Sequence, residues 1–384
     1  MPKQPPLRVL YVAYWGLTEP LGQSLILPAI KRLAQLGVDL TLVTFEKPRD
    51  VARVNEIRSL QDSLQELGVR WTPLKYHKQP RVPATVFDIA HGCARAILGG
   101  LRVRPDVIHA RTFVGGLIGL SIAPILRARL VYHNEGFYPD EQVDGGFWAA
   151  GSFQHRLAKR LENRMYARSD GIIALSHRAK REIDQMSEVQ RKQTPVIVVP
   201  SCVDLDRFQL GQAPDLAPDQ VLRLVYIGSI GGRYQLDKMA RMVKVASDRG
   251  VRIHLSVLSG ADRGAVESIL PGAGLSDSAW SLDSVPHREI PGRLAQTHAG
   301  VLFLNRGISE RGCSPTKIGE YWATGLPVVT TPNISDTEDI IRNERVGVIV
   351  ENHSDGDYLK AIQELRALLA DQGTAERCRR AAEM

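Results

Sequence analysis

The chain twice places a short apolar run ahead of a glycine-containing loop and an amphipathic segment. In the first half, Arg8–Trp15 precedes a loop that contains Gly22. In the second half, Val221–Ile227 precedes the loop Gly228–Arg233 and a predicted helix that extends to about Asp248. Apolar runs without alternation are typical of parallel strands that helices cover on both faces. The repeated order of strand, loop, helix and strand predicts an α/β protein with two doubly wound domains.

Length and composition agree with two globular domains. The chain has 384 residues, of which 43% are hydrophobic and 24% are charged, and this suffices for two full cores. We predict a first domain over residues 1–205, a linker rich in Pro, Asp and Ala over residues 206–220, and a second domain over residues 221–384. The longest nearly apolar run, Phe113–Leu126, has 14 residues and predicts a buried helix, since a membrane span needs ~20.

The cysteines indicate a reducing environment. They are scattered and form no CxxC pair: Cys93, Cys202, Cys313 and Cys378. This spacing argues against a zinc site or a disulfide framework. The apolar run near the start, Val9–Trp15, is too short for a secretory signal and no small-residue cleavage site follows it. We therefore expect a cytoplasmic protein.

Positive charge is concentrated in the first half. Residues 1–205 hold 28 Lys and Arg against 19 Asp and Glu, whereas residues 206–384 hold 21 against 23. This asymmetry predicts an anionic partner for the first domain, such as a membrane surface, a lipid phosphate or a polyanion. No nucleic-acid-binding motif accompanies the charge, so we do not expect nucleic acid as a partner.

One predicted helix departs from the usual residue preferences. Ser314 is a suitable N-cap, Pro315 suits the first helical position and Gly325 suits the left-handed residue after the helix. Lys317 lies in the first turn, where the helix dipole disfavours a cation and a bound phosphate would stabilise it. Glu320 follows on the same face and can accept hydrogen bonds from ribose hydroxyls. The alternative is a surface helix with a Lys–Glu pair.

This stretch, from Ser314 to Val329, resembles the donor-binding motif of retaining glycosyltransferases with the GT-B fold, in glycosyltransferase family 4. The resemblance implies two Rossmann-like domains that face each other across a cleft. It also implies that Lys317 holds the donor diphosphate and Glu320 the ribose. The family often has a second glutamate eight residues before Glu320, and that position is Gly312 here. Glu310, or the backbone N–H groups of Arg311–Cys313, would then contact the transferred sugar.

The glycine loop of the second half is the other predicted phosphate site. Its backbone N–H groups can hold a diphosphate, with Arg233 as the counter-charge. In the family a basic residue stands at the position that Ser229 occupies here, so Arg233 takes that role by inference. His287 lies in the turn that contacts the nucleobase in relatives. The resemblance implies a wider set of donor-binding residues: Gly22, Gly228, Ser229, Gly231, Gly232, Arg233, Gly260, His287, Cys313, Ser314, Pro315, Thr316, Lys317 and Glu320.

Polar residues at the ends of two first-domain strands predict an acceptor or sugar site. His109 and Arg111 end one strand, and His133 and Glu135 follow the next. Ligands of open α/β sheets bind at the carboxyl ends of strands. Gln23, beside Gly22, is a further candidate from the resemblance. The predicted catalytic residues are Lys317, Arg233, Glu320, His109 and His133, although each histidine also has an ordinary structural explanation.

Three further segments carry clusters of charged residues. Pro139–Trp148 is predicted to be an acidic loop. Ser152–Arg168 is a basic helix, whose apolar residues either enter the core or, with its arginines, contact a membrane. Asp204 and Asp206 form a DxD pair, which is a metal signature in the other major transferase fold. Because this pair lies at a domain boundary, we predict that it does not bind a metal ion. Relatives continue into a last helix that crosses back to the first domain, whereas this sequence stops at Met384 and does not match them there. A truncated end and last residues that pack back towards the first domain are the two expectations.

The prediction is therefore a metal-independent, retaining glycosyltransferase without a cofactor. By resemblance, a donor phosphate oxygen helps to deprotonate the acceptor, and UDP is the commonest nucleotide in such donors. We expect a glycan or lipid-linked acceptor, in synthesis of cell-envelope polysaccharide, glycolipid or a related glycoconjugate, with a location in the cytoplasm and at the inner face of the membrane. One alternative is a non-catalytic protein that binds a sugar nucleotide or a lipid phosphate. Another is a nicotinamide-dependent oxidoreductase, but its GxGxxG fingerprint is absent.

Overall fold

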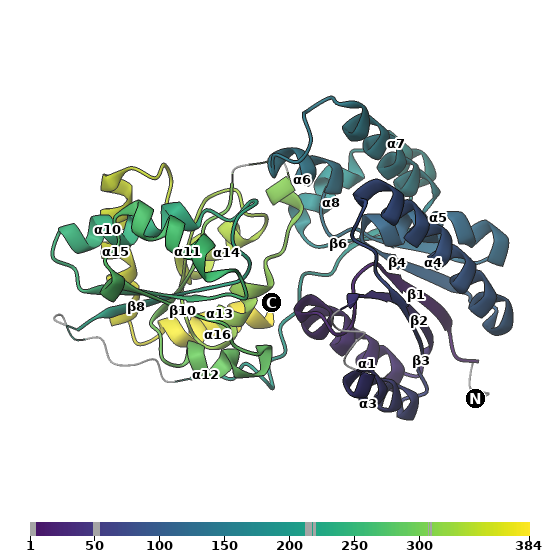
Figure 1. Ribbon diagram of the computed structural model, residues 1–384, viewed down its shortest axis with the longest axis horizontal. Coiled ribbons are helices and arrows are strands. Elements are labelled where there is room, and N and C mark those ends of the chain that lie inside the picture. Colours follow the sequence, from purple (N-terminus) through teal and green to yellow (C-terminus); the bar gives the residue numbers. More distant parts are fainter. Residues whose placement is uncertain (1–4, 49–53, 212–216, 218–219, 306, 308) are drawn as a thin grey trace. The chain divides into compact units, whose positions relative to one another are not determined.

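The computed structural model describes residues 5–48, 54–211, 217, 220–305, 307 and 309–384. These residues form two compact units, and each has its own parallel sheet (Figure 1). One unit contains residues up to Asp140 together with Trp148–Pro200. The other contains Glu141–Phe147 together with Ser201–Met384. The boundaries at residues 205 and 221 stay predictions, because much of the linker lies outside the described residues.

The first unit is built on a seven-stranded sheet with the order β3-β2-β1-β4-β5-β6-β7, in which every pairing is parallel. The strands are β1 (Arg8–Ala13), β2 (Asp39–Glu46), β3 (Arg70–Lys75), β4 (Val107–Arg111), β5 (Arg129–His133), β6 (Gly171–Ala174) and β7 (Val196–Val198). The helices are α1 (Leu27–Gln35), α3 (Val54–Glu66), α4 (Arg81–Val103), α5 (Thr112–Leu126), α6 (Tyr138–Asp144), α7 (Phe153–Arg168), α8 (His177–Asp184) and α9 (Ser187–Lys192). Figure 1 shows α1 and α3 on one face of this sheet and α4 and α5 on the other.

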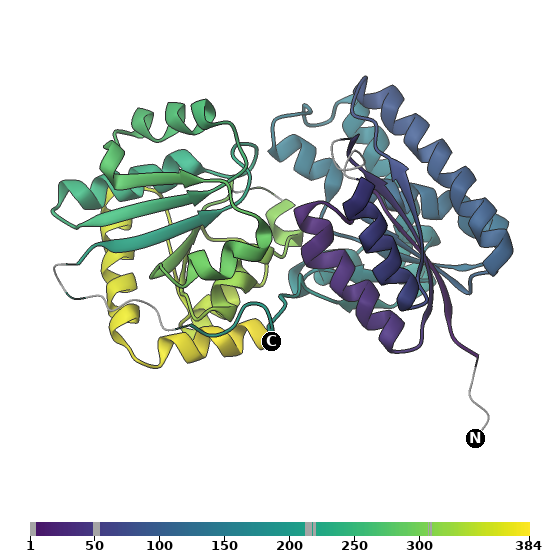
Figure 2. The ribbon, with the colours of Figure 1, turned by 60° about the horizontal axis from the view of Figure 1, so that its bottom comes forward.

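The second unit repeats this arrangement on a six-stranded parallel sheet with the order β10-β9-β8-β11-β12-β13. Its strands are β8 (Leu222–Ile227), β9 (Ile253–Leu258), β10 (Trp280–Asp283), β11 (Ala299–Leu302), β12 (Val328–Thr330) and β13 (Gly347–Ile349). Its helices are α10 (Leu236–Asp248), α11 (Arg263–Ile269), α12 (Ile290–Leu294), α13 (Thr316–Ala323), α14 (Thr337–Glu344), α15 (Asp355–Ala370) and α16 (Thr374–Glu383). Figure 2 shows this sheet with helices on both of its faces.

Both sheets reverse their strand order beside their first strand, between β1 and β4 and between β8 and β11. Loops at the carboxyl ends of such neighbouring strands diverge and leave room for a ligand. The prediction of two doubly wound α/β units is therefore confirmed. The apolar run over 113–126 lies in α5, and eight of its 14 residues are buried, as expected.

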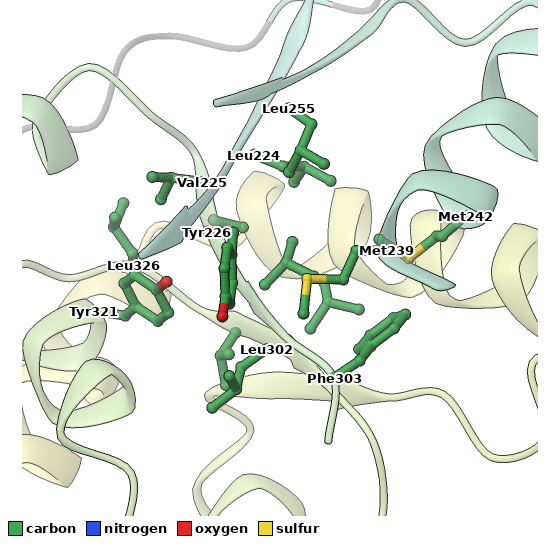
Figure 3. Packing of buried hydrophobic residues seen from close by; sticks show 14 of the residues in the cluster. Leu224, Val225, Tyr226, Met239, Met242, Leu255, Leu302, Phe303, Tyr321 and Leu326 are labelled. Atoms are coloured by element: carbon green, nitrogen blue, oxygen red, sulfur yellow. The ribbon is translucent and has the colours of Figure 1, made fainter. Parts of the chain in front are cut away.

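The core of the second unit fixes the position of α13. Figure 3 shows part of this core, including the large side chains of Tyr226, Met239, Phe303 and Tyr321. The ring of Tyr321 lies where a side chain on Gly300 of β11 would be, so only glycine fits there. The Tyr321 hydroxyl accepts the N–H of Ile227 at 3.1 Å. These contacts tie the helix to the ends of β8 and β11.

Three local predictions were wrong in detail. Helix α13 begins at Thr316 with Pro315 at the N-cap, and no side chain caps it. The Ser314 hydroxyl was expected to cap the helix. It instead accepts the N–H of Ser201 at 3.1 Å, which is a tertiary contact. The acidic segment that starts at Pro139 is largely helix α6, not loop. The helix after β1 begins as a π-helical turn, Gly22–Ile26, before α1. The sequence also predicts an amphipathic helix over Val51–Leu67, of which α3 is the described part, and residues 51–53 lie outside the described residues.

Candidate functional site

Lys317 occupies the centre of a cluster at the carboxyl end of β8. Its ammonium lies 4.0 Å from the ring centroid of Tyr234 and 5.9 Å from that of Tyr226, which is a cation–π arrangement with Tyr234. A side chain on Gly228 would overlap the Lys317 chain and approach its Nζ to 2.8 Å. Among the described residues, no carboxylate lies within 4.0 Å of this ammonium. The lysine is thus held by apolar and aromatic contacts, and its charge is left for another partner.

Arg233 adds a second cation beside the first. Its Nη1 atom is buried and has no hydrogen-bond partner in the described part of the chain. The same atom lies 3.8 Å from carboxylate oxygens of Glu141 and Glu310, too far for a hydrogen bond. Burial alone would raise the pKa of Tyr234, but the neighbouring Lys317 and Arg233 charges lower it. This region therefore favours a negative group.

Glu310 lies at the edge of this cluster in the 3-10 turn Ser309–Gly312. It is only 1% exposed, and its Oε1 atom has no hydrogen-bond partner within the described residues. Burial raises the pKa of Glu310, although Arg233 opposes the shift. Cys313 donates to the Glu310 carbonyl at 3.1 Å, and burial raises the pKa of its thiol. Cys313 therefore supports the turn and is unsuited to nucleophilic attack.

Asp144 forms a hydrogen bond with the first residue of this turn. Its Oδ2 atom accepts the N–H of Ser309 at 3.0 Å and lies where a side chain on Gly307 would be. Asp144 belongs to the segment Glu141–Phe147, which packs with the second unit although it lies in the first half of the sequence. The sequence offers no local signal for this contact, because more than 160 residues separate its partners.

Glu320 of α13 forms a separate pair with His287, which lies in the 3-10 turn His287–Glu289. The Nε2 atom of His287 lies 3.0 Å from Oε1 of Glu320, and the carboxylate is almost fully buried. The other ring nitrogen of His287 has no hydrogen-bond partner among the described residues. The two predicted residues are therefore brought together, and His287 orients the carboxylate that is predicted to hold the ribose.

The remaining predicted donor residues lie in the loops after β8 and β9 and at the start of α13. Gly228, Gly231 and Gly232 all have positive φ angles, of 140°, 84° and 63°, which glycine adopts without strain. Ser229 is exposed, and its carbonyl accepts the Tyr226 hydroxyl at 2.5 Å. Gly260 is exposed just after β9. Pro315 and Thr316 start α13 beside Ser314.

The predicted acceptor residues of the first unit form a buried cluster at the carboxyl ends of β4 and β5. His109 Nε2 lies 3.1 Å from His133 Nδ1, and Arg111 forms a salt bridge with Glu135. Burial, assisted by the Arg111 charge, lowers the pKa of His109 to about 3 and that of His133 well below its ordinary value. Both rings are thus neutral near pH 7. The Tyr11 ring packs on His109 with centroids 4.3 Å apart.

Gly22 and Gln23 begin the π-helical turn that follows the loop after β1, and the buried Glu46 holds that loop. A side chain on Gly22 would overlap the Gly16 carbonyl, so the loop requires glycine there. The Gln23 amide donates to the Leu17 carbonyl at 2.7 Å, and Glu46 accepts the N–H groups of Leu17 and Thr18. Gln23 thus has a structural partner in this state, and Glu46, which the sequence did not indicate, fixes the loop.

A second unpredicted cluster lies beside this loop. Asp88 of α4 is fully buried and accepts hydrogen bonds from the Tyr14 hydroxyl at 2.8 Å and from the backbone N–H of His77 at 3.0 Å. Its other oxygen lies 2.6 Å from His77 Nδ1. Only an isolated aspartate in an apolar helix face marked this position in the sequence.

The described residues contain no group of three His, Cys, Asp or Glu side chains that could hold a metal ion. The DxD pair is used locally, because Asp204 Oδ1 accepts the N–H groups of Asp206 and Arg207 at 3.1 Å. This is the hydrogen bonding of a turn. None of the helices in the described ranges could span a membrane.

Two family models match most of the chain. The model of Glycosyltransferase Family 4 matches residues 25–207, and the model of Glycosyl transferases group 1 matches residues 222–367. The first covers the unit with the histidine pair, and the second covers the unit with Lys317. No curated protein has a significantly similar sequence.

Solved structures of low sequence identity share the fold along nearly the full chain. Sucrose-phosphate synthase from Thermosynechococcus elongatus has a TM-score of 0.68 at 13% identity, over 98% of this chain and 94% of the other. Anabaena HepE in complex with UDP and glucose has a TM-score of 0.64 at 14% identity, with the same two coverages. A glycosyltransferase from Rickettsia africae has a TM-score of 0.65 at 13% identity, over 98% of this chain and 93% of the other. At these identities the similarity shows the shared two-domain fold.

Proposed function

This chain belongs to the glycosyltransferases that resemble family 4 and have the GT-B fold, and we propose that it moves a sugar from a nucleotide diphosphate donor to an acceptor hydroxyl with retention of configuration. The observation that carries this proposal is the Lys317 ammonium. It lies over Tyr234, beside a glycine that leaves it uncovered, and no carboxylate of the described residues neutralises it.

The donor diphosphate fits this cluster electrostatically. As the bond between the sugar C1 atom and the phosphate oxygen breaks, negative charge develops on the leaving diphosphate. Lys317 and Arg233 would stabilise that charge, which makes a metal ion unnecessary. The acceptor oxygen forms the new bond to C1 on the same face, and its proton passes to a phosphate oxygen of the departing nucleoside diphosphate. This route needs no protein nucleophile.

The pair of Glu320 and His287 supports the placement of the nucleoside. Glu320 would accept hydrogen bonds from ribose hydroxyls, while His287 keeps its carboxylate in position. Glu310, whose Oε1 atom has no partner in the described part of the chain, would contact a hydroxyl of the transferred sugar. The complex of HepE with UDP and glucose makes UDP the first nucleotide to test.

The first unit would supply the acceptor side. The neutral histidine pair and the Arg111–Glu135 salt bridge offer hydrogen-bonding groups there without net charge. The exposed surface of helix α7 is an argument for the second part of the proposal, in which the acceptor is a glycan or a lipid-linked molecule at an anionic membrane surface on the cytoplasmic side. Its Phe153 and Leu157 are 70% and 43% exposed, although Met165 on the same apolar stripe is buried. Such exposed apolar residues beside arginines are typical of peripheral membrane contact.

A thermal-shift titration with UDP, GDP, ADP and NAD at equal millimolar concentration tests the donor site. A ligand at ~100 times its dissociation constant stabilises a protein by about 2.7 kcal/mol. We expect one nucleoside diphosphate to raise the midpoint, and Lys317→Ala and Glu320→Ala to abolish the shift. The matched control is Lys360→Ala, which removes an exposed lysine from α15.

Turnover of the matching nucleotide sugars separates the proposal from its alternatives. A transferase releases the nucleoside diphosphate when an acceptor is present, whereas a sugar-nucleotide binding protein gives the thermal shift without release. A shift by NAD alone, or equal shifts in wild type and Lys317→Ala, would contradict the donor assignment.

A further inference from the structure

A cavity of about 510 Å³ lies at the opposite edge of the first sheet from the histidine cluster. Its walls come from the amino ends of β1, β4 and β5 and from the residues that end α4 and α5. Four arginines line it, Arg8, Arg104, Arg127 and Arg129, and the only acidic residue among its lining residues is Asp106. The cavity is therefore strongly cationic, and none of the donor or acceptor residues described above belongs to it.

One arginine is neutralised inside the cavity wall. Arg8 Nη2 donates to Asp106 Oδ1 at 2.6 Å, and Arg8 Nε donates to the other carboxylate oxygen at 3.1 Å. The hydrogen bonds from Arg8 lower the pKa of Asp106 to about 2, so this acid stays charged near neutral pH. The pair accounts for the single negative charge. The other three arginines of the cavity are Arg104, Arg127 and Arg129.

Arg104, Arg127 and Arg129 have no salt bridge within the described residues. Arg129 acts at longer range on Asp170, whose pKa it helps to lower. Arg104 and Arg127 end α4 and α5 with φ angles of 49° and 53°, in the left-handed region. Three arginines from two chain segments, 104–107 and 126–129, thus line one cavity whose only acidic lining residue is paired with Arg8. Arginine side chains match the geometry of phosphate oxygens.

A structural explanation accounts for part of this arrangement. Cations stabilise the carbonyl ends of helices, and Arg345 ends α14 with a φ of 54° in the second unit. The left-handed conformation of Arg104 and Arg127 therefore does not carry the inference. Arg129 starts β5 two residues after Arg127, so chain continuity brings it to the same cavity, but the helix dipole gives no reason for a cation at this position. It also gives no reason for the apolar surface beside it.

That apolar surface lies on the last turns of the two helices. Leu98 and Leu101 of α4 are 59% and 60% exposed, and Ile125 of α5 is 57% exposed. Leu7, which lines the cavity, is 50% exposed. The charged residues that α4 exposes are all arginines, and its single acid, Asp88, is buried. A ligand that combines phosphate with an apolar chain would match both features.

We propose that this cavity binds a phosphate group through Arg104, Arg127 and Arg129. The exposed leucines beside it indicate a lipid headgroup as the source, with the end of α4 resting on the bilayer, and a soluble phosphate compound shares the same chemistry. The site is independent of the donor site, because none of its residues belongs to the Lys317 cluster.

Vesicle co-sedimentation of the full chain tests the lipid source. Vesicles of phosphatidylcholine alone are compared with vesicles that contain equal parts phosphatidylcholine and phosphatidylglycerol. We expect binding to the anionic vesicles, weakened about fivefold by each Arg→Gln substitution at 104, 127 or 129, since each cation near such a surface contributes roughly 1 kcal/mol. The triple variant should bind on the order of 100-fold more weakly. Arg345→Gln is the matched control, because it removes an arginine from an equivalent helix end and should change nothing.

Two further measurements identify the source and guard against unfolding. Inorganic phosphate should raise the thermal midpoint of the wild type but not that of the triple variant. Leu98→Ser with Leu101→Ser should weaken vesicle binding and keep the phosphate shift if the source is a lipid. A phosphate shift without vesicle binding would assign the site to a soluble phosphate compound. The proposal fails if the triple variant, folded by its circular dichroism, matches the wild type in both assays, or if Arg345→Gln loses as much binding.

Discussion

The two sheets carry polar clusters at equivalent edges, but the clusters differ in how their charges are balanced. In the first unit, Arg111 is paired with Glu135 and the buried histidines are neutral. In the second unit, Lys317 faces an aromatic ring, and no carboxylate of the described residues neutralises it. In the proposed function the donor diphosphate would neutralise Lys317, whereas Arg111 of the first cluster already has Glu135 as its counter-charge.

The largest effect should come from breaking the Arg111–Glu135 pair. Arg111→Met leaves the Glu135 carboxylate buried without its cation, which should destabilise the fold by about 3–5 kcal/mol in urea unfolding. Lys180→Met, which removes an exposed pair with Asp184, should cost less than about 1 kcal/mol. Equal losses in the two variants would show that the Arg111 pair is not structural.

A substitution beside Lys317 should affect binding more than stability. Gly228→Ala would displace the Lys317 chain, and we expect roughly 100-fold weaker nucleoside diphosphate binding by calorimetry, equal to about 2.7 kcal/mol. Gly231→Ala is the control in the same loop. Its φ is also positive, but no atom lies within 4 Å of the added carbon. If both variants bind equally well, Lys317 does not need the space that Gly228 leaves.

The histidine pair should make the first unit sensitive to acid. The folded pKa of His109 is about 3, below the ordinary value of 6.5, so between these values the unfolded chain binds the proton that the folded chain excludes. Stability is therefore complete above about pH 6.5 and falls with decreasing pH, by up to about 1.4 kcal/mol per unit for each such histidine. His109→Gln should make the unfolding free energy less dependent on pH between 4 and 6. An unchanged dependence would show that His109 is protonated in the folded state.

The smallest effect should come from the aromatic ring below Lys317. Tyr234→Leu removes the cation–π contact and should weaken nucleoside diphosphate binding about fivefold, because such contacts contribute roughly 1 kcal/mol. Tyr234→Phe keeps the ring and should bind nearly as the wild type does. A loss in Tyr234→Phe as large as in Tyr234→Leu would instead assign the role to the hydroxyl.

Much of the fold could be predicted because it depends on local patterns. Most of the 13 described strands overlap an apolar run in the sequence, and Gly325 follows α13 with a φ of 85°, as expected. The helix start was misplaced because Ser314 has a tertiary partner, Ser201, that no local pattern reveals. The roles of the predicted donor and acceptor residues stay predictions that the experiments above address.

The sequence by itself determined the two parallel sheets and the chain reversals at glycine. These features follow from apolar periodicity and backbone preferences, which act over a few residues. Only the tertiary structure decided which charges are neutralised. The partners Arg111 and Glu135, Lys317 and Tyr234, and the arginines of the first-unit cavity come from separate segments. Electrostatic balance depends on distances in space, and those are set by packing after the elements have formed.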